Sequence, residues 1–383
     1  MRQEKGLRVL SLFDGMSCGQ IALRDLGFPI EVYYASEIDK FAIQQTQLNF
    51  PDTVQLGDVR NIDVDKLCDE VGEFDLLLAG FPCTDLSLAG KRRGMSTTTK
   101  EKVTSLSQYI DLKDAGFEFA GQSYLFWEFV RIFQRLRERN PKLLFLLENV
   151  EVGKEWDAVI SDTLGIHGVH INSALVSAQN RKRIYWSNIR VREEGLFGYR
   201  YTDIPQPTDR GILLRDILEK EVDEKYFLKD NIAANVIKRF EFNKAKGSGY
   251  GGRIHDENGK MGAVRLGGHG EYDLIQEQTS EYLSIPNANN HLQKNLTDVD
   301  SKANAFLATS HKGAWANGMS LVSRGLRIRR ITPTECARLQ TIPDWYIWDC
   351  SATQQYRMLG NGWCVEVIKH IFSFLSEHFE RQN

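Results

Sequence analysis

Short apolar runs alternate with amphipathic helical patterns along the first half of this chain. VLSLF at 9–13 and VYYASEI at 32–38 are each followed by a helical pattern, and FDLLLAG at 74–80 and LLFLLENV at 143–150 lie on either side of the amphipathic stretch 124–140. Parallel strands need a crossover, usually a helix, to join them. The alternation therefore predicts a doubly wound α/β sheet. RIYWSNI at 183–189 is predicted to be a further strand.

The alternation weakens from about residue 196. Residues 241–320 hold eleven glycines, which predicts a loop-rich region. A helical pattern returns at ITPTECARL, where Thr332, Pro333 and Glu335 fit an N-cap, a first-turn proline and a capping-box acid, and again at WCVEVIKHIFSFL. At 383 residues the chain exceeds the ~250 to 300 residues at which single cores stop growing. We therefore expect a large α/β lobe interrupted by an irregular insertion.

Composition narrows the class of protein. No run approaches the ~18 apolar residues of a membrane span, and the first residues lack the apolar block of a signal peptide, so we expect a cytoplasmic protein without membrane contact. The six cysteines form no Cys-x-x-Cys pair and have no neighbouring histidine, which predicts reduced thiols and no metal site. The net charge of -3 neither supports nor excludes binding to nucleic acid, because enzymes that act on nucleic acids often confine their positive charge to one cleft.

The ends of the first three predicted strands carry residues suited to a nucleoside. Gly15 and Gly19 occupy the first strand-to-helix turn, Glu37 ends the second strand and Asp58 ends the third. The Gly-x-Gly-x-x-Gly pattern is absent, and Asp14 in the turn would repel a pyrophosphate. S-adenosylmethionine fits better, since its positive sulfonium and ammonium favour nearby carboxylates. The alternative is that these glycines only form a turn.

Cys83 follows the fourth predicted strand, directly after a proline. At a strand-to-loop turn beside a cleft it could be a nucleophilic thiolate, whereas most single cysteines are packed thiols. The neighbouring residues favour the nucleophile. The next strand ends in Glu148 and Asn149, at the edge where open sheets bind ligands. Glu148, among apolar residues, is expected to have a raised pKa and to donate a proton; the alternative is a local cap or salt bridge.

Arg181 and Arg183 alternate with Lys182 in QNRKRIYW, so on a strand the two arginines would share one face. They could then point into the cleft together. The alternative is a solvated basic edge strand.

Taken together, these motifs resemble those of the DNA cytosine-5 methyltransferases. The resemblance covers roughly 1–195 and 328–383, and rests on FDGMSCG, Glu37, GDVR, GFPCTDLS, LENV, QNRKR, TPTECARLQ and GNGWCVEVI in this order. It implies an α/β fold of the S-adenosylmethionine-dependent methyltransferase type, with a Rossmann-like mixed sheet and a smaller inserted domain. The implied catalytic domain is 1–195 plus 328–383, and the implied target-recognition domain is 196–327.

The resemblance also implies roles for individual residues. Cys83 would attack C6 of a cytosine flipped out of duplex DNA, Glu148 would bind ring N3 and the exocyclic amine, and Arg183 with Arg181 would contact the base oxygen and its surroundings. C5 would then accept the methyl group. The residues implied to bind S-adenosylmethionine are Phe13, Gly15, Glu37, Ile38, Asp58, Val59, Pro82, Leu125 and Asn361.

Residues 95–122 are a departure from the family, because many bacterial members have only a few residues there. The stretch lengthens the loop after Cys83. It either closes over DNA and adds phosphate or minor-groove contacts, or is a mobile surface insertion.

The expected partners are double-stranded DNA and, acting separately, a cognate restriction endonuclease, with the chain itself a monomer on DNA. Three other functions are weighed against this one. They are a tRNA cytosine methyltransferase of the same fold, a non-catalytic DNA-binding relative, and a nicotinamide oxidoreductase. The tRNA methyltransferases have a Cys-Phe-Thr sequence that is missing here. A non-catalytic relative is disfavoured because Cys83, Glu148, Arg181 and Arg183 are all present. A nicotinamide oxidoreductase is disfavoured by Asp14 and by the missing third glycine.

Overall fold

The computed structural model describes residues 6–82, 102–119, 121–227 and 327–380, with the short segments 253–256, 273–276, 303–304 and 320–324. The chain forms two compact units. The first unit comprises Met1–Ile171, Lys182–Gln206 and Val367–Asn383, and the second comprises Asn172–Arg181 and Pro207–Glu366. Within the described residues, no helix has the length and apolar character needed to cross a membrane.

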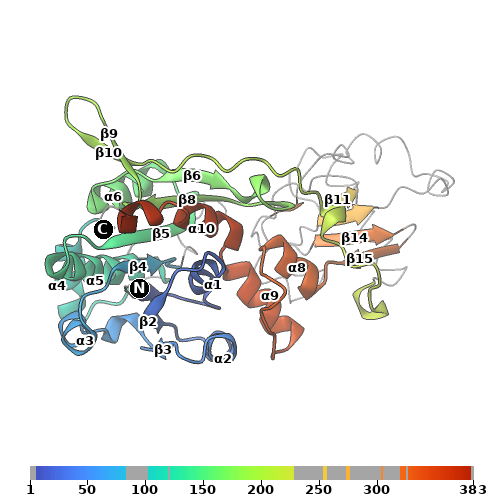
Figure 1. The fold of residues 1–383 in the computed structure, drawn as a ribbon, viewed down its shortest axis with the longest axis horizontal. Helices are drawn as coiled ribbons and strands as arrows, with labels where there is room; N and C mark the ends of the chain where they lie inside the picture. The colour runs from blue at the N-terminus through green and yellow to red at the C-terminus, as the bar shows by residue number, and fades with distance from the viewer. Residues whose placement is uncertain are drawn as a thin grey trace. The chain divides into compact units, whose positions relative to one another are not determined.

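A seven-stranded sheet forms the centre of the first unit, in the order β3-β2-β1-β4-β5-β8-β6 (Figure 1). Its strands from β3 to β5 pair in parallel, and β5 pairs with β8 in antiparallel. The predicted mixed α/β sheet is therefore confirmed. The strands are β1 Leu7–Leu12, β2 Ile30–Ser36, β3 Val54–Gln55, β4 Leu76–Ala79, β5 Leu144–Val150, β6 Val169–Asn172 and β8 Lys182–Ser187.

Helices connect the parallel strands, as the alternating pattern predicts. The helices of the first unit are α1 Cys18–Asp25, α2 Lys40–Asn49, α3 Val64–Val71, α4 Leu106–Asp114, α5 Phe126–Arg139, α6 Lys154–Leu164 and α11 Ser376–Glu380, with the 3-10 turns η1 Val59–Asn61 and η2 Ser123–Leu125. Side chains of Asp39, Asp63 and Ser105 cap α2, α3 and α4 by accepting from backbone N–H groups of their first turns. The hairpin of β9 Val191–Glu194 and β10 Tyr199–Thr202 also belongs to this unit.

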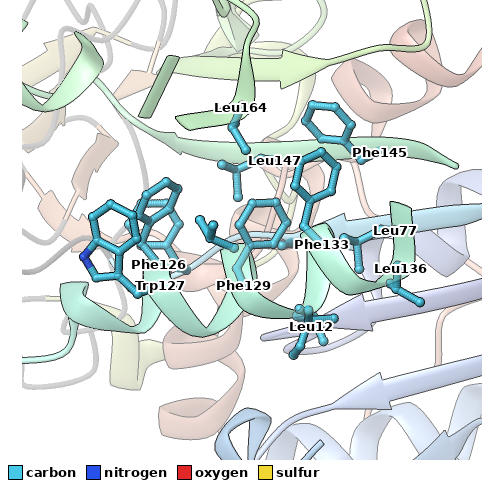
Figure 2. Close-up of a cluster of buried hydrophobic side chains, with 14 of the residues drawn as sticks. Leu12, Leu77, Phe126, Trp127, Phe129, Phe133, Leu136, Phe145, Leu147 and Leu164 are labelled. Atoms are coloured by element: carbon cyan, nitrogen blue, oxygen red, sulfur yellow. The ribbon is translucent and has the colours of Figure 1, made fainter. Parts of the chain in front are cut away.

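The core of the first unit is built on α5. Its apolar residues recur at helical spacing as Phe126, Phe129, Phe133 and Leu136, and form one buried cluster with residues of β1, β4, β5, α3 and α6 (Figure 2). The rings of Phe129 and Phe133 stack with centroids 5.7 Å apart, and Phe133 lies 4.8 Å from Phe145 of β5. This packing fixes α5 against the face of the sheet formed by β1, β4 and β5.

The second unit contains a small sheet and the predicted capped helix. Its elements are β7 Gln179–Asn180, β11 Arg253–Asp256, β12 Asp273–Gln276, β13 Ala303–Asn304, β14 Ser320–Arg324, β15 Arg327–Arg330, α8 Pro333–Leu339 and α9 Ala352–Asn361, with the 3-10 turns η3 Ser173–Leu175, η4 Leu214–Asp216 and η5 Glu224–Tyr226. Thr332 and Glu335 form the predicted capping box. α10 Val365–Phe372 occupies the predicted last helical pattern. Most of the glycine-rich stretch 241–320 lies outside the described residues.

Gly168 is a position where any side chain would disturb the core. A Cβ there would lie 2.6 Å from Ile184 Cγ2 and 3.0 Å from the indole of Trp186, both buried in β8. We predict that Gly168→Ala lowers the free energy of unfolding by about 1–3 kcal/mol in urea titrations, the usual cost of overpacking. Gly153→Ala is the control, because open space surrounds that position and its φ is −65°. Equal losses in the two variants would contradict the prediction.

Candidate cofactor and catalytic site

The pairing of the parallel strands brings four strand ends to one edge of the sheet. Leu12 of β1 pairs with Ser36 of β2 and with Ala79 of β4, and Ala79 pairs with Leu147 of β5. The residues that follow are Phe13, Glu37, Gly80 and Glu148. Because strand order reverses at β1, this edge is the switch point at which open α/β sheets bind ligands.

The turn after β1 has a tightly wound backbone. Phe13, Gly15 and Ser17 all have positive φ, at 58°, 59° and 63°, a conformation that is uncommon for residues with a side chain. Asp14, which is half-buried, stabilises this turn. Its carboxylate accepts hydrogen bonds from the hydroxyls of Tyr33, at 2.9 Å, and of Ser17. The sequence predicts that this carboxyl would repel a pyrophosphate. In the structure, the carboxyl holds the turn through its hydrogen bonds.

Glu37 joins the turns after β1 and β2. One carboxylate oxygen accepts from Gly15 N at 2.8 Å, and the other accepts from the backbone N–H groups of Ile38 and Asp39 at 2.7 and 2.8 Å. Ile38 itself is 70% exposed. Gly15 and Glu37, both implied to bind S-adenosylmethionine, therefore belong to one hydrogen-bonded group, and the apolar side chain of Ile38 is exposed beside it.

Asp58 is the N-cap of η1 and is paired with a cation. It accepts from Arg60 N at 3.0 Å and forms an ion pair with the Arg60 guanidinium at 2.5 Å. The side-chain hydrogen bond from Arg60 is the main reason why the pKa of Asp58 lies below its ordinary value. Val59, the next residue, is buried.

The backbone leading to Cys83 is held by two side chains. Asn149 Nδ2 donates to Phe81 O at 3.1 Å, and Ser123 Oγ donates to Pro82 O at 3.0 Å. Leu125 ends η2, two residues after Ser123. Cys83 lies outside the described residues, so its thiol is not placed. The sequence places Asn149 at the end of a predicted strand but predicts no role for its amide. No local pattern singles out Ser123.

Glu148 and Arg183 form an ion pair across two strands. Arg183 Nε lies 2.9 Å from Glu148 Oε1, with side chains only 13% and 10% exposed. Glu148 pairs in register with Tyr185, so Arg183 is its diagonal neighbour on the same face. The local salt bridge, which was the alternative for Glu148, is present, and it brings together two residues implied to contact the base.

Arg181 has different partners from Arg183. It lies between β7 and β8, in the second unit, and is buried. Its guanidinium donates to Gly362 O at 2.9 Å and to Gly360 O at 3.4 Å. These carbonyls flank Asn361, an exposed residue at the end of α9. The structure thus gives Arg181 a role in shaping the backbone around Asn361, instead of a common strand face with Arg183.

Known proteins are similar to this chain over most of its length. A family model described as C-5 cytosine-specific DNA methylase matches residues 7–377. The type II methyltransferase M1.ScrFI of Lactococcus lactis subsp. cremoris is 28% identical over 391 residues, covering 99% of this chain and 80% of that protein. M.HpaII of Haemophilus parainfluenzae is 27% identical over 373 residues, covering 94% and 86%.

Solved structures share the fold. The Dnmt2 methyltransferase of S. pombe matches with a TM-score of 0.57 at 15% identity, covering 97% of this chain and 99% of that chain. The Entamoeba histolytica methyltransferase EhMeth matches with a TM-score of 0.58 at 13% identity, covering 98% and 99%.

We predict that Asp14 makes stability depend on pH. Burial raises its pKa to about 6, against an ordinary value of 3.8, despite hydrogen bonds from Ser11, Ser17 and Tyr33 that act to lower it. The stabilising contribution of this group is therefore complete below about pH 4 and is lost as the pH rises through about 6. Urea titrations should show wild type losing stability relative to Asp14→Asn over that range. A difference that does not change between about pH 4 and 7 would contradict this.

Proposed function

Because the chain belongs to the C-5 cytosine-specific DNA methylase family, we propose that it methylates C5 of a cytosine flipped out of duplex DNA, through a covalent bond between Cys83 and C6. The observation that carries the proposal is the ion pair between Glu148 and Arg183. Glu148 lies on β5, next to β4, which leads into Pro82 and Cys83, and Arg183 lies on β8.

The residues at the sheet edge fit S-adenosylmethionine. Glu37 and Asp58 place carboxylates at neighbouring strand ends, and exposed Ile38 offers an apolar surface for the adenine. Phe13, Gly15, Val59, Pro82 and Leu125 are proposed to complete the binding site in the first unit. Asn361 lies in the second unit, and its role stays a prediction from its motif. When bound, S-adenosylmethionine supplies a methyl group on a positive sulfonium.

The proposed chemistry proceeds in balanced steps. The Cys83 thiolate adds to C6, and the electron pair of the C5–C6 double bond becomes available at C5 to accept the methyl group. Glu148, oriented by Arg183, binds N3 and the exocyclic amine, where charge builds up. The methyl transfer would leave S-adenosylhomocysteine, and loss of the C5 proton to water would then restore the double bond and expel the thiolate. Asn149 and Ser123 keep the backbone before Cys83 in place during the reaction.

We also propose the two domains that the sequence predicts. Residues 1–195 and 328–383 would form the catalytic domain, and 196–327 would recognise the target sequence in double-stranded DNA. The second compact unit extends further, to Glu366, and includes α8 and α9. We propose further that the chain acts as a monomer in the cytoplasm, and that a cognate restriction endonuclease acts separately.

Cys83→Ala should abolish transfer of labelled methyl groups to duplex DNA. We expect the rate to fall at least about a thousandfold, because no other group replaces the nucleophile. Cys350→Ala is the control, since burial raises the pKa of that thiol to about 11 and it lies in the second unit. Label that passes to tRNA but not to DNA, or transfer that persists in Cys83→Ala, would refute the proposal.

DNA containing 5-fluorocytosine should trap the enzyme. Fluorine at C5 cannot leave as a proton does, so the Cys83–C6 bond should persist after methyl transfer. We expect a band of protein plus DNA that survives denaturing electrophoresis and requires both S-adenosylmethionine and Cys83. The same band in Cys83→Ala would show that another residue is the nucleophile.

A further inference from the structure

Glu128 is a buried carboxylate that the proposed reaction does not use. It lies on α5 and its side chain has no exposed surface. It accepts hydrogen bonds from Tyr109 OH at 2.7 Å, from Lys113 Nζ at 2.5 Å and from Arg131 Nε at 2.8 Å. Burial acts to raise the pKa of Glu128, but these donors together hold it below its ordinary value. A buried charge is tolerated only when it is paired in this way.

Two of the three donors come from α4, which lies within the loop insertion 95–122. Tyr109 is 1% exposed, and its ring lies 4.9 Å from Phe119 and 6.2 Å from Tyr124. Val103, just before the helix, is completely buried in the same core cluster. The described part of the insertion, 102–119, is therefore packed against α5 by a buried side chain and two charge-assisted contacts. Residues 95–101 and 120 lie outside the described residues.

The third donor leads to the turn that carries Asp58. Arg131 uses its remaining nitrogens to donate to Ile62 O at 3.1 Å and to Val59 O at 3.4 Å. Val59 is the first residue of η1, and Ile62 follows its last residue. One guanidinium thus connects Glu128 with both ends of the turn. Lys113 also lies close enough to help lower the pKa of Asp58.

We propose that Glu128, held by Tyr109 and Lys113, is a positioning residue for the cofactor. It fixes the guanidinium of Arg131, which in turn fixes the 58–62 turn, so the docking of α4 sets the affinity for S-adenosylmethionine. Only the identity of the ligand rests on the proposed function. A turn held in its binding conformation before the ligand arrives pays less ordering entropy, and this appears directly as affinity.

The coupling is reciprocal. If docked α4 favours the ligand, then the ligand must favour docked α4 by the same factor. Hydrogen exchange in wild-type protein measures this without any substitution. We expect saturating S-adenosylhomocysteine, the demethylated product, to slow exchange of the α4 amides at least about fivefold more than exchange in α6, which serves as internal reference. Equal effects on α4 and α6 would overturn the proposal.

Tyr109→Phe tests the hydroxyl directly and keeps the ring packing. Calorimetric titration with S-adenosylhomocysteine should show Kd raised about tenfold, with Kd for DNA in the absence of cofactor unchanged. The control is Ser161→Ala on α6, which removes the acceptor of a buried hydrogen bond from Trp186 of β8. We expect the control to lower Tm at least as much as Tyr109→Phe does and to leave Kd unchanged.

The outcomes separate this inference from the proposed function. If wild type binds the ligand and Tyr109→Phe binds it equally well, Glu128 is only a structural residue and the inference is wrong. If wild type does not bind the ligand at all, the proposed function is wrong. Lys113→Met removes the second donor from α4 and should also weaken binding; an unchanged Kd in both variants would refute the role of α4.

Discussion

Parallel pairing of β1 with both β2 and β4 determines where chemistry is located in this chain. Helices leave β1 and β2 from the same edge, so turns from separate parts of the sequence meet there, and a small ligand can contact several of them. Leu12, Ala79 and Leu147 pair in register across β1, β4 and β5. This register sets the spacing between the proposed cofactor-binding residues after β1 and the proposed base-binding residue Glu148. The relative positions of Phe13, Glu37, Gly80 and Glu148 depend on this alignment.

Buried glutamates within the described residues each have an arginine partner. Glu148 pairs with Arg183 at the proposed base site, Glu128 with Arg131 behind the proposed cofactor turn, and Glu335 with Arg329 at the start of α8. Such pairs add little net stability over apolar packing, but removing one partner costs about 3–5 kcal/mol. They occur where the orientation of a turn, a helix start or a catalytic carboxyl matters. In each case the charge fixes geometry that apolar contacts alone would leave adjustable.

The parts of the site that depend on local sequence could be predicted. Gly15, Glu37 and Asp58 stand at strand ends that hydrophobic periodicity reveals, and the capping box of Thr332 and Glu335 is a signal within four residues. The nucleophile remains a prediction from its motif. Contacts over long sequence distances could not be predicted, because no local pattern encodes them. Arg181 binding to Gly362, and Tyr109 binding to Glu128, follow from packing.

β8 pairs antiparallel with β5, and this pairing limits where insertions and deletions can occur in the sheet. Side chains alternate between faces along a strand, so Glu148 and Arg183 meet only in one phase of the pairing. A change of length in the connection between β5 and β8 preserves this pair only where the strand re-enters in that phase. Loss of a single residue between Arg183 and Ser187 would instead turn the guanidinium toward the opposite side of the sheet. Length variation in descendants of this chain should therefore accumulate in the connection and spare the strand.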